Sequence, residues 1–157
     1  MSKTKIILQL DFDTPDELNI GLVKCIQELQ DFYFFYQLNT QNSFHFERKK
    51  DLKIIGTNFD TYYSVYEAFS EEMQNTIRFF SNAPCGRIQK KEITELFSEE
   101  TEEQLLFPNS EIRYIMNCSQ YTDDFSLILQ PKIDLFQIEN FLLSPDEKLF
   151  DLIQYYE

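Results

Sequence analysis

The feature that most constrains this chain is the spacing of large apolar side chains between residues 60 and 80. These are Tyr62, Tyr66, Phe69, Met73, Ile77 and Phe80, and they recur at steps of four and three residues. That spacing places them on one face of a helix with 3.6 residues per turn. Asp60 is suited to cap the start, and Pro84 blocks continuation beyond the end. The sequence therefore predicts one long amphipathic helix over 60–80, resting on a sheet that buries its aromatic face.

The residues before this helix complete a predicted opening order of β-α-β-β-α. The expected elements are a strand over 5–12, a helix from 14 to about 30, strands over 32–36 and 44–50, and the helix over 60–80. Thr14-Pro15-Asp16-Glu17 is typical of a helix capping box, and Leu18, Leu22, Ile26 and Leu29 would form the buried stripe that follows. Five successive aromatic residues at 32–36 favour a strand, with extension of the preceding helix as the alternative. A short strand is also expected over 52–55.

The second half of the chain predicts a mixture of helix and strand. One or two short helices are expected over 86–107, and a β-hairpin from strands over 112–118 and 125–130. Ser144-Pro145-Asp146-Glu147 repeats the capping arrangement and opens a final helix. The chain has only 3 Gly and 5 Pro among 157 residues, and no linker divides it. We therefore expect one α+β domain over residues 1–157, a sandwich of an antiparallel or mixed sheet covered by helices.

The charge of the chain limits its partners. The formal net charge is −13, from 27 acidic and 14 basic side chains. A surface of this sign repels phosphate backbones and anionic membranes, so we expect no direct binding of nucleic acid and no membrane association. A basic protein is the complementary partner, since opposite fields steer association. The alternative is that the charge serves only solubility.

The cysteines and the single histidine predict no cofactor and no metal site. Cys25, Cys85 and Cys118 are odd in number and contain no CxxC pair, which is typical of reduced thiols. His45 lies between two phenylalanines, and one histidine does not build a histidine-rich metal site. The apolar run at 6–10 is too short for a signal peptide, and no stretch is long enough to span a bilayer. These observations predict a cytoplasmic protein.

Three short segments bear on a catalytic alternative. Asp11-Phe12-Asp13-Thr14, at the end of the first predicted strand, resembles the phosphotransfer motif of haloacid-dehalogenase-type phosphatases. Phe79-Phe80-Ser81-Asn82 and Tyr121-Thr122-Asp123-Asp124 resemble, in order, that family's Ser/Thr-Asn strand end and its terminal acidic pair. The resemblance implies that Asp11 attacks phosphorus, Ser81 binds phosphate, and Asp123 or Asp124 holds Mg²⁺. The motif's usual glycine after the second aspartate is replaced by Thr14.

An acidic stretch over 92–103 is the candidate partner-binding surface. It combines carboxylates that would steer a basic partner with apolar side chains that would anchor it. The predicted contact residues are Glu95, Leu96, Phe97, Glu99, Glu100, Glu102 and Glu103. The function predicted on this basis is an inhibitor, immunity-type or antitoxin-like protein that engages a basic partner. The alternatives are the Mg²⁺-dependent phosphatase using Asp11 and Asp13, and a structural or assembly protein. The oligomeric state is left open.

Overall fold

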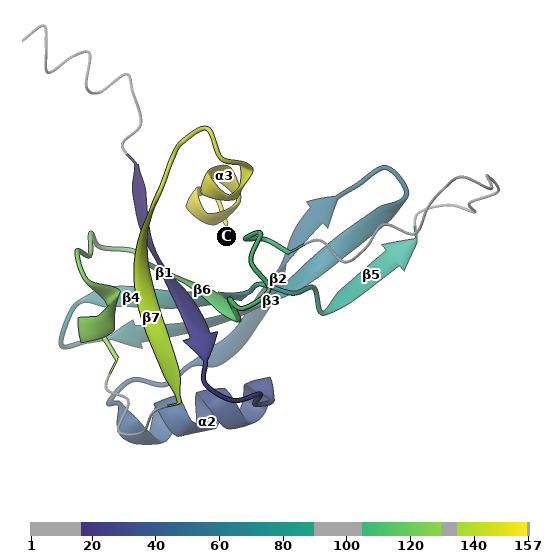
Figure 1. Ribbon diagram of the computed structural model, residues 1–157. Coiled ribbons are helices and arrows are strands. Elements are labelled where there is room, and N and C mark those ends of the chain that lie inside the picture. The colour runs from purple at the N-terminus through teal and green to yellow at the C-terminus, as the bar shows by residue number, and fades with distance from the viewer. Residues whose placement is uncertain (1–16, 90–104, 130–134, 157) are drawn as a thin grey trace, which may run out of the picture.

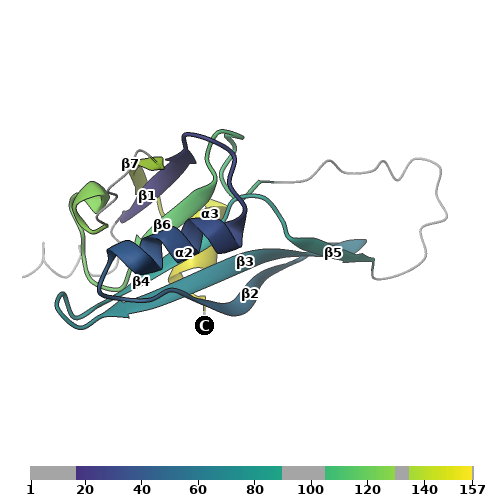
Figure 2. The same ribbon diagram turned by 90° about the horizontal axis from the view of Figure 1, so that it is seen from below.

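The computed structural model describes residues 17–89, 105–129 and 135–156, which form one antiparallel sheet with a helix on each face (Figure 1). The strands are β1 (Leu18–Cys25), β2 (Glu47–Ile55), β3 (Phe59–Ser70), β4 (Asn75–Ser81), β5 (Gly86–Gln89), β6 (Tyr114–Cys118) and β7 (Phe136–Leu143). The helices are α2 (Asp31–Gln41) and α3 (Lys148–Gln154), and η1 (Phe125–Leu127) is a short 3₁₀ turn. The strand order is β2-β3-β4-β6-β1-β7, with β5 paired to β3. In both views β2, β3 and β5 extend beyond the rest of the sheet (Figures 1 and 2).

Each face of the sheet carries its own hydrophobic core. The core on the α2 side contains Val23, Phe34, Phe35, Leu38, Phe46, Ala68, Ile77, Phe79, Tyr114, Met116, Phe125 and Phe136, among others. The core on the α3 side contains Ile20, Leu22, Tyr63, Val65, Phe80, Ile115, Leu143, Leu149, Phe150 and Ile153, among others. Because both faces are covered, the central strands are apolar on both sides. The alternation of polar and apolar residues that marks a half-exposed strand is therefore lost.

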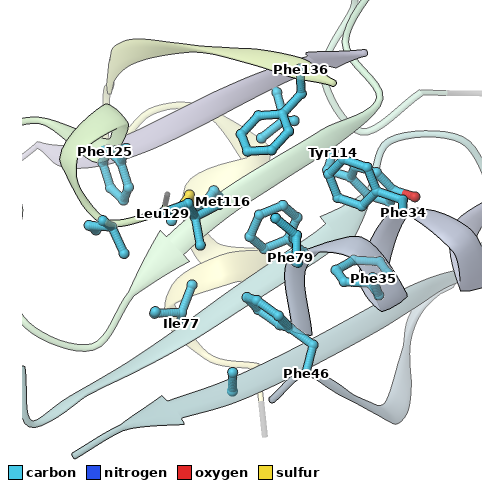
Figure 3. Packing of buried hydrophobic residues seen from close by; sticks show 14 of the residues in the cluster. Phe34, Phe35, Phe46, Ile77, Phe79, Tyr114, Met116, Phe125, Leu129 and Phe136 are labelled. Carbon is cyan, nitrogen blue, oxygen red and sulfur yellow. The ribbon is translucent and has the colours of Figure 1, made fainter. Parts of the chain in front are cut away.

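Aromatic contacts dominate the core on the α2 side (Figure 3). The Phe34 ring stacks on Tyr114 with 4.8 Å between centroids, and Phe35 meets Phe79 edge-on at 5.5 Å. Such geometries add about 0.5–1.5 kcal/mol per pair beyond the burial of area. These contacts join α2 to the centre of the sheet.

The coarse prediction of an antiparallel sheet with helices is confirmed, and the predicted opening order is not. From Leu18 onward the described elements run β-α-β-β-β. The strand expected over 5–12 and the capping box at Thr14 lie outside the described residues. The helix expected at the fifth position, over 60–80, is replaced by the two strands β3 and β4.

The helix predicted from 14 to about 30 is wrong over its described part, because Leu18–Cys25 is strand β1. This strand lies between β6 and β7, in the interior of the sheet. Ile20 and Leu22 point into the core on the α3 side, and Val23 points into the opposite core. Burial on both faces produces an apolar density that mimics a helical stripe.

The strand predicted over 32–36 is also wrong, because these residues form the first turns of α2. On a helix Phe34, Phe35 and Leu38 share one face, and all three are buried. Asp31 begins the helix, where a negative charge is favoured by the helix dipole. The remaining aromatic residues point to the other side of the helix.

The long helix predicted over 60–80 is the largest error, because the segment is a β-hairpin. β3 pairs antiparallel with β4 from Val65–Phe80 to Ser70–Asn75. The turn between them contains no glycine, and Gln74 adopts a positive φ of 50°. Ile77 is buried as predicted, but Phe69 is 51% exposed and Met73 38% exposed near the turn.

The C-terminal predictions are partly right. β6 falls within the strand predicted over 112–118, but it pairs with β1 and β4, and Phe125–Leu127 is η1 rather than the second strand of a hairpin. The segment 86–89 is strand β5 rather than helix. The final helix is present as α3, with Leu149 and Ile153 buried. Ser144 does not cap it by its side chain, since the N-cap residue is Glu147.

Candidate functional site

The predicted partner-binding residues all lie outside the described part of the chain. Glu95, Leu96, Phe97, Glu99, Glu100, Glu102 and Glu103 all fall within 90–104, outside the described residues. The best-supported candidate surface in the described part of the chain is formed by α2 and the residues beside its first turn.

The outer face of α2 exposes three aromatic side chains. Phe32 is 72% exposed, Tyr36 60% and Tyr33 42%. They lie opposite the buried Phe34, Phe35 and Leu38, so the helix is aromatic on both sides. An aromatic cluster of this kind on a described surface is a common mark of a protein contact. We call Phe32, Tyr33 and Tyr36 the outer face of α2.

Asp31 fixes the position of this helix on the sheet. Its Oδ1 accepts hydrogen bonds from the Tyr114 hydroxyl and from Arg113 Nη2, the latter at 2.8 Å. Its Oδ2 accepts from the Tyr66 hydroxyl at 3.3 Å. Burial and the hydrogen bond to this carboxylate raise the pKa of Tyr114 well above its usual value. Three donors from β3, β6 and the residue before β6 therefore converge on the first residue of α2.

A groove of about 680 Å³ adjoins the start of α2. It is lined by residues 24–28, Ser110, Glu111, Arg113 and Gln137, and we call it the α2 groove. Arg113 joins the groove to Asp31. Ile26, 53% exposed, contributes an apolar side chain to its wall.

Carboxylates outnumber cations around the α2 groove. Lys24 lies 3.8 Å from Glu111 and 3.7 Å from Glu139, whose side chains are 73% and 62% exposed. Glu28 is also exposed, and Arg113 is already paired with Asp31. Helix α2 contains no basic residue. The region therefore has unbalanced negative charge beside exposed aromatic rings.

The thiols do not form a catalytic arrangement in the described residues. Cys25 lines the α2 groove, and burial raises its pKa, which keeps it in the less nucleophilic thiol form. Burial also raises the pKa of Cys118 to about 11. Cys85 is exposed, with its Sγ 3.6 Å from Asp51 Oδ2. His45 is exposed in the segment between α2 and β2.

The residues of the phosphatase resemblance have structural partners where they are described. Ser81 does end a strand, β4, as that resemblance implies, and its hydroxyl donates to Ala83 O. Asp124 Oδ1 accepts from Ser126 and Asn140. Asp11 and Asp13 lie outside the described residues. The strand pairs in the described residues are all antiparallel, whereas βαβ units require parallel pairs.

Asn82 shows why a Ser-Asn pair occurs at this position. Its Nδ2 donates to the carbonyls of Phe107, Asn109 and Ile112, and its Oδ1 accepts from Phe107 N at 2.5 Å. The side chain therefore anchors the segment that precedes β6. This role is structural: three carbonyls share the two Nδ2 hydrogens, and Oδ1 accepts one backbone N–H.

The described part of the chain contains no group of three or more His, Cys, Asp or Glu side chains positioned to hold a metal ion. Among the described helices, none has the length and apolar character needed to cross a membrane.

The chain matches no protein-family model, no curated protein and no solved structure. Inference about its function therefore rests on the α2 groove, the outer face of α2 and the charge of the chain.

This surface does not follow from the sequence, because five successive aromatic residues at 32–36 favour a strand. The composition of residues 32–36 argued against a half-exposed strand, because all five are aromatic and none would give such a strand a polar, solvent-facing side. In a helix, Phe34 and Phe35 are buried and the other three aromatic side chains remain exposed. These three exposed side chains identify the candidate surface.

Proposed function

We propose that this protein is a protein-binding module that receives a basic segment of a partner on α2 and the α2 groove. The observation that carries the proposal is the exposure of the outer face of α2 beside a groove lined by Glu28 and Glu111. A third carboxylate, Glu139, lies 3.7 Å from Lys24 of the same groove. Exposed aromatic side chains supply contact area at low entropic cost. Neighbouring carboxylates supply steering and specificity.

The chemistry of the occupant follows from the charges. A lysine or arginine side chain of the partner would enter the α2 groove and compete with Lys24 for Glu111 and Glu139, both of which are more than 3.5 Å from Lys24. The aromatic rings of the outer face of α2 would pack on apolar or cationic groups next to it in the partner's sequence. The net charge of −13 also favours a positively charged partner.

Helix α2 is held firmly against the sheet, which suits it to partner binding. The hydrogen bonds at Asp31 and the packing of Phe34 and Phe35 hold the helix in one position before any partner arrives. Preorganisation reduces the ordering cost of association. An inhibitor, immunity-type or antitoxin-like role fits such a module, because these proteins act by occupying a partner.

The proposal is tested by affinity purification from the native cell with matched variants. The test variant is Phe32→Ser with Tyr36→Ser. The control is Ile55→Ser with Ile88→Ser, which removes comparably exposed apolar side chains from β2 and β5. We expect one protein to be retained by the wild type and the control and lost from the test variant, with elution promoted by salt. Its contact segment, mapped by cross-linking to residues 24–36, should be rich in Lys and Arg.

Two results would contradict the proposal. One is a partner retained equally by the test variant. The other is a partner whose cross-linked segment is acidic or whose binding is insensitive to salt.

A further inference from the structure

Strand β2 lies at one edge of the sheet and concentrates positive charge in an acidic chain. Four of the 14 basic residues of the chain lie within the 9 residues of this strand: Arg48, Lys49, Lys50 and Lys53. All four are exposed. In a protein of net charge −13, β2 is therefore a local surface of the opposite sign. We call β2, with these four cations, the basic edge.

Two of the four cations have a carboxylate partner, and two do not. Arg48 Nη2 lies 2.7 Å from Asp51 Oδ1, and Lys53 Nζ lies 3.6 Å from a carboxylate oxygen of β3. Lys49 and Lys50 form no ion pair within the described part of the chain. Because both side chains are exposed, they are available to the carboxylates of another molecule.

The backbone of β2 has no strand on its outer side. Among the described residues, β2 pairs with β3 and with no other strand. The outer side of such a strand presents N–H and C=O groups to which an extended peptide can add as a further strand. In both views, the end of β2 near β5 extends beyond the two helices (Figures 1 and 2).

Side chains bind the β2 edge only near the start of the strand. Asn39 Oδ1 accepts from Phe46 N at 2.7 Å, and Asn39 Nδ2 donates to Phe46 O at 3.3 Å, just before the strand begins. The Tyr156 hydroxyl donates to Lys50 O. The register with β3 then shifts, and regular pairing resumes at Leu52. From Leu52 onward, no described side chain binds the backbone of β2, so this part of the edge is open.

We infer that the basic edge receives an extended acidic segment of another protein, which adds to β2 as a strand from Leu52 onward. The backbone of the segment would bond to the outer side of β2, and its carboxylates would pair with Lys49 and Lys50. The excess of cations on β2 selects this occupant, because opposite charges on neighbouring strands attract and like charges repel. A second copy of β2 would bring the same cations, and lysines on an edge strand oppose such pairing.

The basic edge is separate from the proposed surface on α2. It lies at the β2 edge of the sheet, whereas the α2 groove is lined by residues of β1 and β7 at the other edge. The two surfaces also favour partners of opposite charge. The inference therefore goes beyond the proposed function and does not rest on it.

The test is an NMR titration of the full chain with a short peptide of alternating glutamate and valine. One control peptide has lysine in place of glutamate. The other keeps the glutamates but is N-methylated along its backbone, so that it cannot donate the hydrogen bonds of an added strand. We expect saturable shifts of the backbone amides of residues 52–55 with the first peptide, and at least about tenfold weaker binding of both controls. Binding should also weaken as salt rises.

A matched pair of variants separates the basic edge from a general effect of charge. Lys50→Glu should weaken binding of the glutamate–valine peptide at least about tenfold. Lys148→Glu makes the same change of charge at an exposed position of α3 and should bind the peptide as the wild type does.

Four results would overturn the inference. They are the absence of saturable shifts at residues 52–55, equal binding of the N-methylated peptide, and full binding by Lys50→Glu. The fourth is a shift of the same amides with protein concentration in the absence of peptide, which would identify a second copy of the chain as the occupant.

Discussion

The Asp31 carboxylate lies 2.8 Å from the Arg113 guanidinium, although 82 residues separate them in the chain. The same carboxylate accepts from the hydroxyls of Tyr66 and Tyr114. This cluster attaches the first residue of α2 to two strands, and its Arg113 also lines the α2 groove. It therefore links the stability of the helix to the proposed partner surface.

Replacing Asp31 with Asn should destabilise the protein by about 1.5–3 kcal/mol, because it removes a charged acceptor shared by three donors. Urea unfolding measures the change. Asp51→Asn is the matched control, since Asp51 pairs with Arg48 at the surface, where such a pair contributes about 0–1 kcal/mol. Equal losses in the two variants would show that the Asp31 cluster does not hold α2.

Replacing each of the three glycines with alanine should change the stability of the protein by a different amount. A Cβ at Gly56 would meet Phe59 O at 2.6 Å, and one at Gly21 would meet Phe125 and Ile138 side-chain atoms at 3.1 Å. A Cβ at Gly86 meets nothing within 4 Å. We expect Gly56→Ala to destabilise most, Gly21→Ala by about 1–3 kcal/mol, and Gly86→Ala to be neutral or stabilising. In thermal unfolding, a Gly21→Ala variant as stable as Gly86→Ala would contradict the packing of η1 on β1.

The sequence could predict an antiparallel sheet with helices, and it located β6 and α3 to within a few residues. It could not predict the β3–β4 hairpin, for two physical reasons. Tyr66 and Ala68 pack toward one core while Tyr63 and Val65 pack toward the other, so the alternation typical of a strand is absent. The turn lacks glycine, and Gln74 supplies the positive φ instead.

The candidate site was hidden for a related reason. α2 is aromatic around most of its circumference, so no amphipathic period identified it as a helix. Its inner residues are recognisable only once Tyr114 and Phe79, far away in the sequence, are known to lie beneath them.

Cys118 should make stability depend on alkaline pH. Burial raises its pKa from about 9 to about 11, so between these values the folded state binds more protons than the unfolded state. Its contribution is fully present below pH 9 and is lost as the pH rises toward 11, by about 2–3 kcal/mol in total. The stability difference between wild type and Cys118→Ala should shift by that amount over this range. A difference that is constant with pH would show that the thiol is not buried in solution.

The acidic stretch over 92–103 remains a predicted partner surface, and charge reversal tests it. Changing Glu99, Glu100, Glu102 and Glu103 to Lys should slow association with a basic partner more than it speeds dissociation, because rim charges act mainly through steering. Stability should change by no more than about 0.5 kcal/mol. Unchanged association kinetics in low salt would leave this stretch with solubility as its role.

The most direct test of the central claim is the binding kinetics of the purified partner, measured by surface plasmon resonance on α2 variants. Phe32→Ser with Tyr36→Ser should raise the dissociation rate by about tenfold or more, because buried aromatic anchors dominate interface energies. Glu28→Gln with Glu139→Gln should instead lower the association rate, and only at low salt. If the partner dissociates from the Phe32→Ser, Tyr36→Ser variant at the same rate as from the wild type, the outer face of α2 is not where the partner binds.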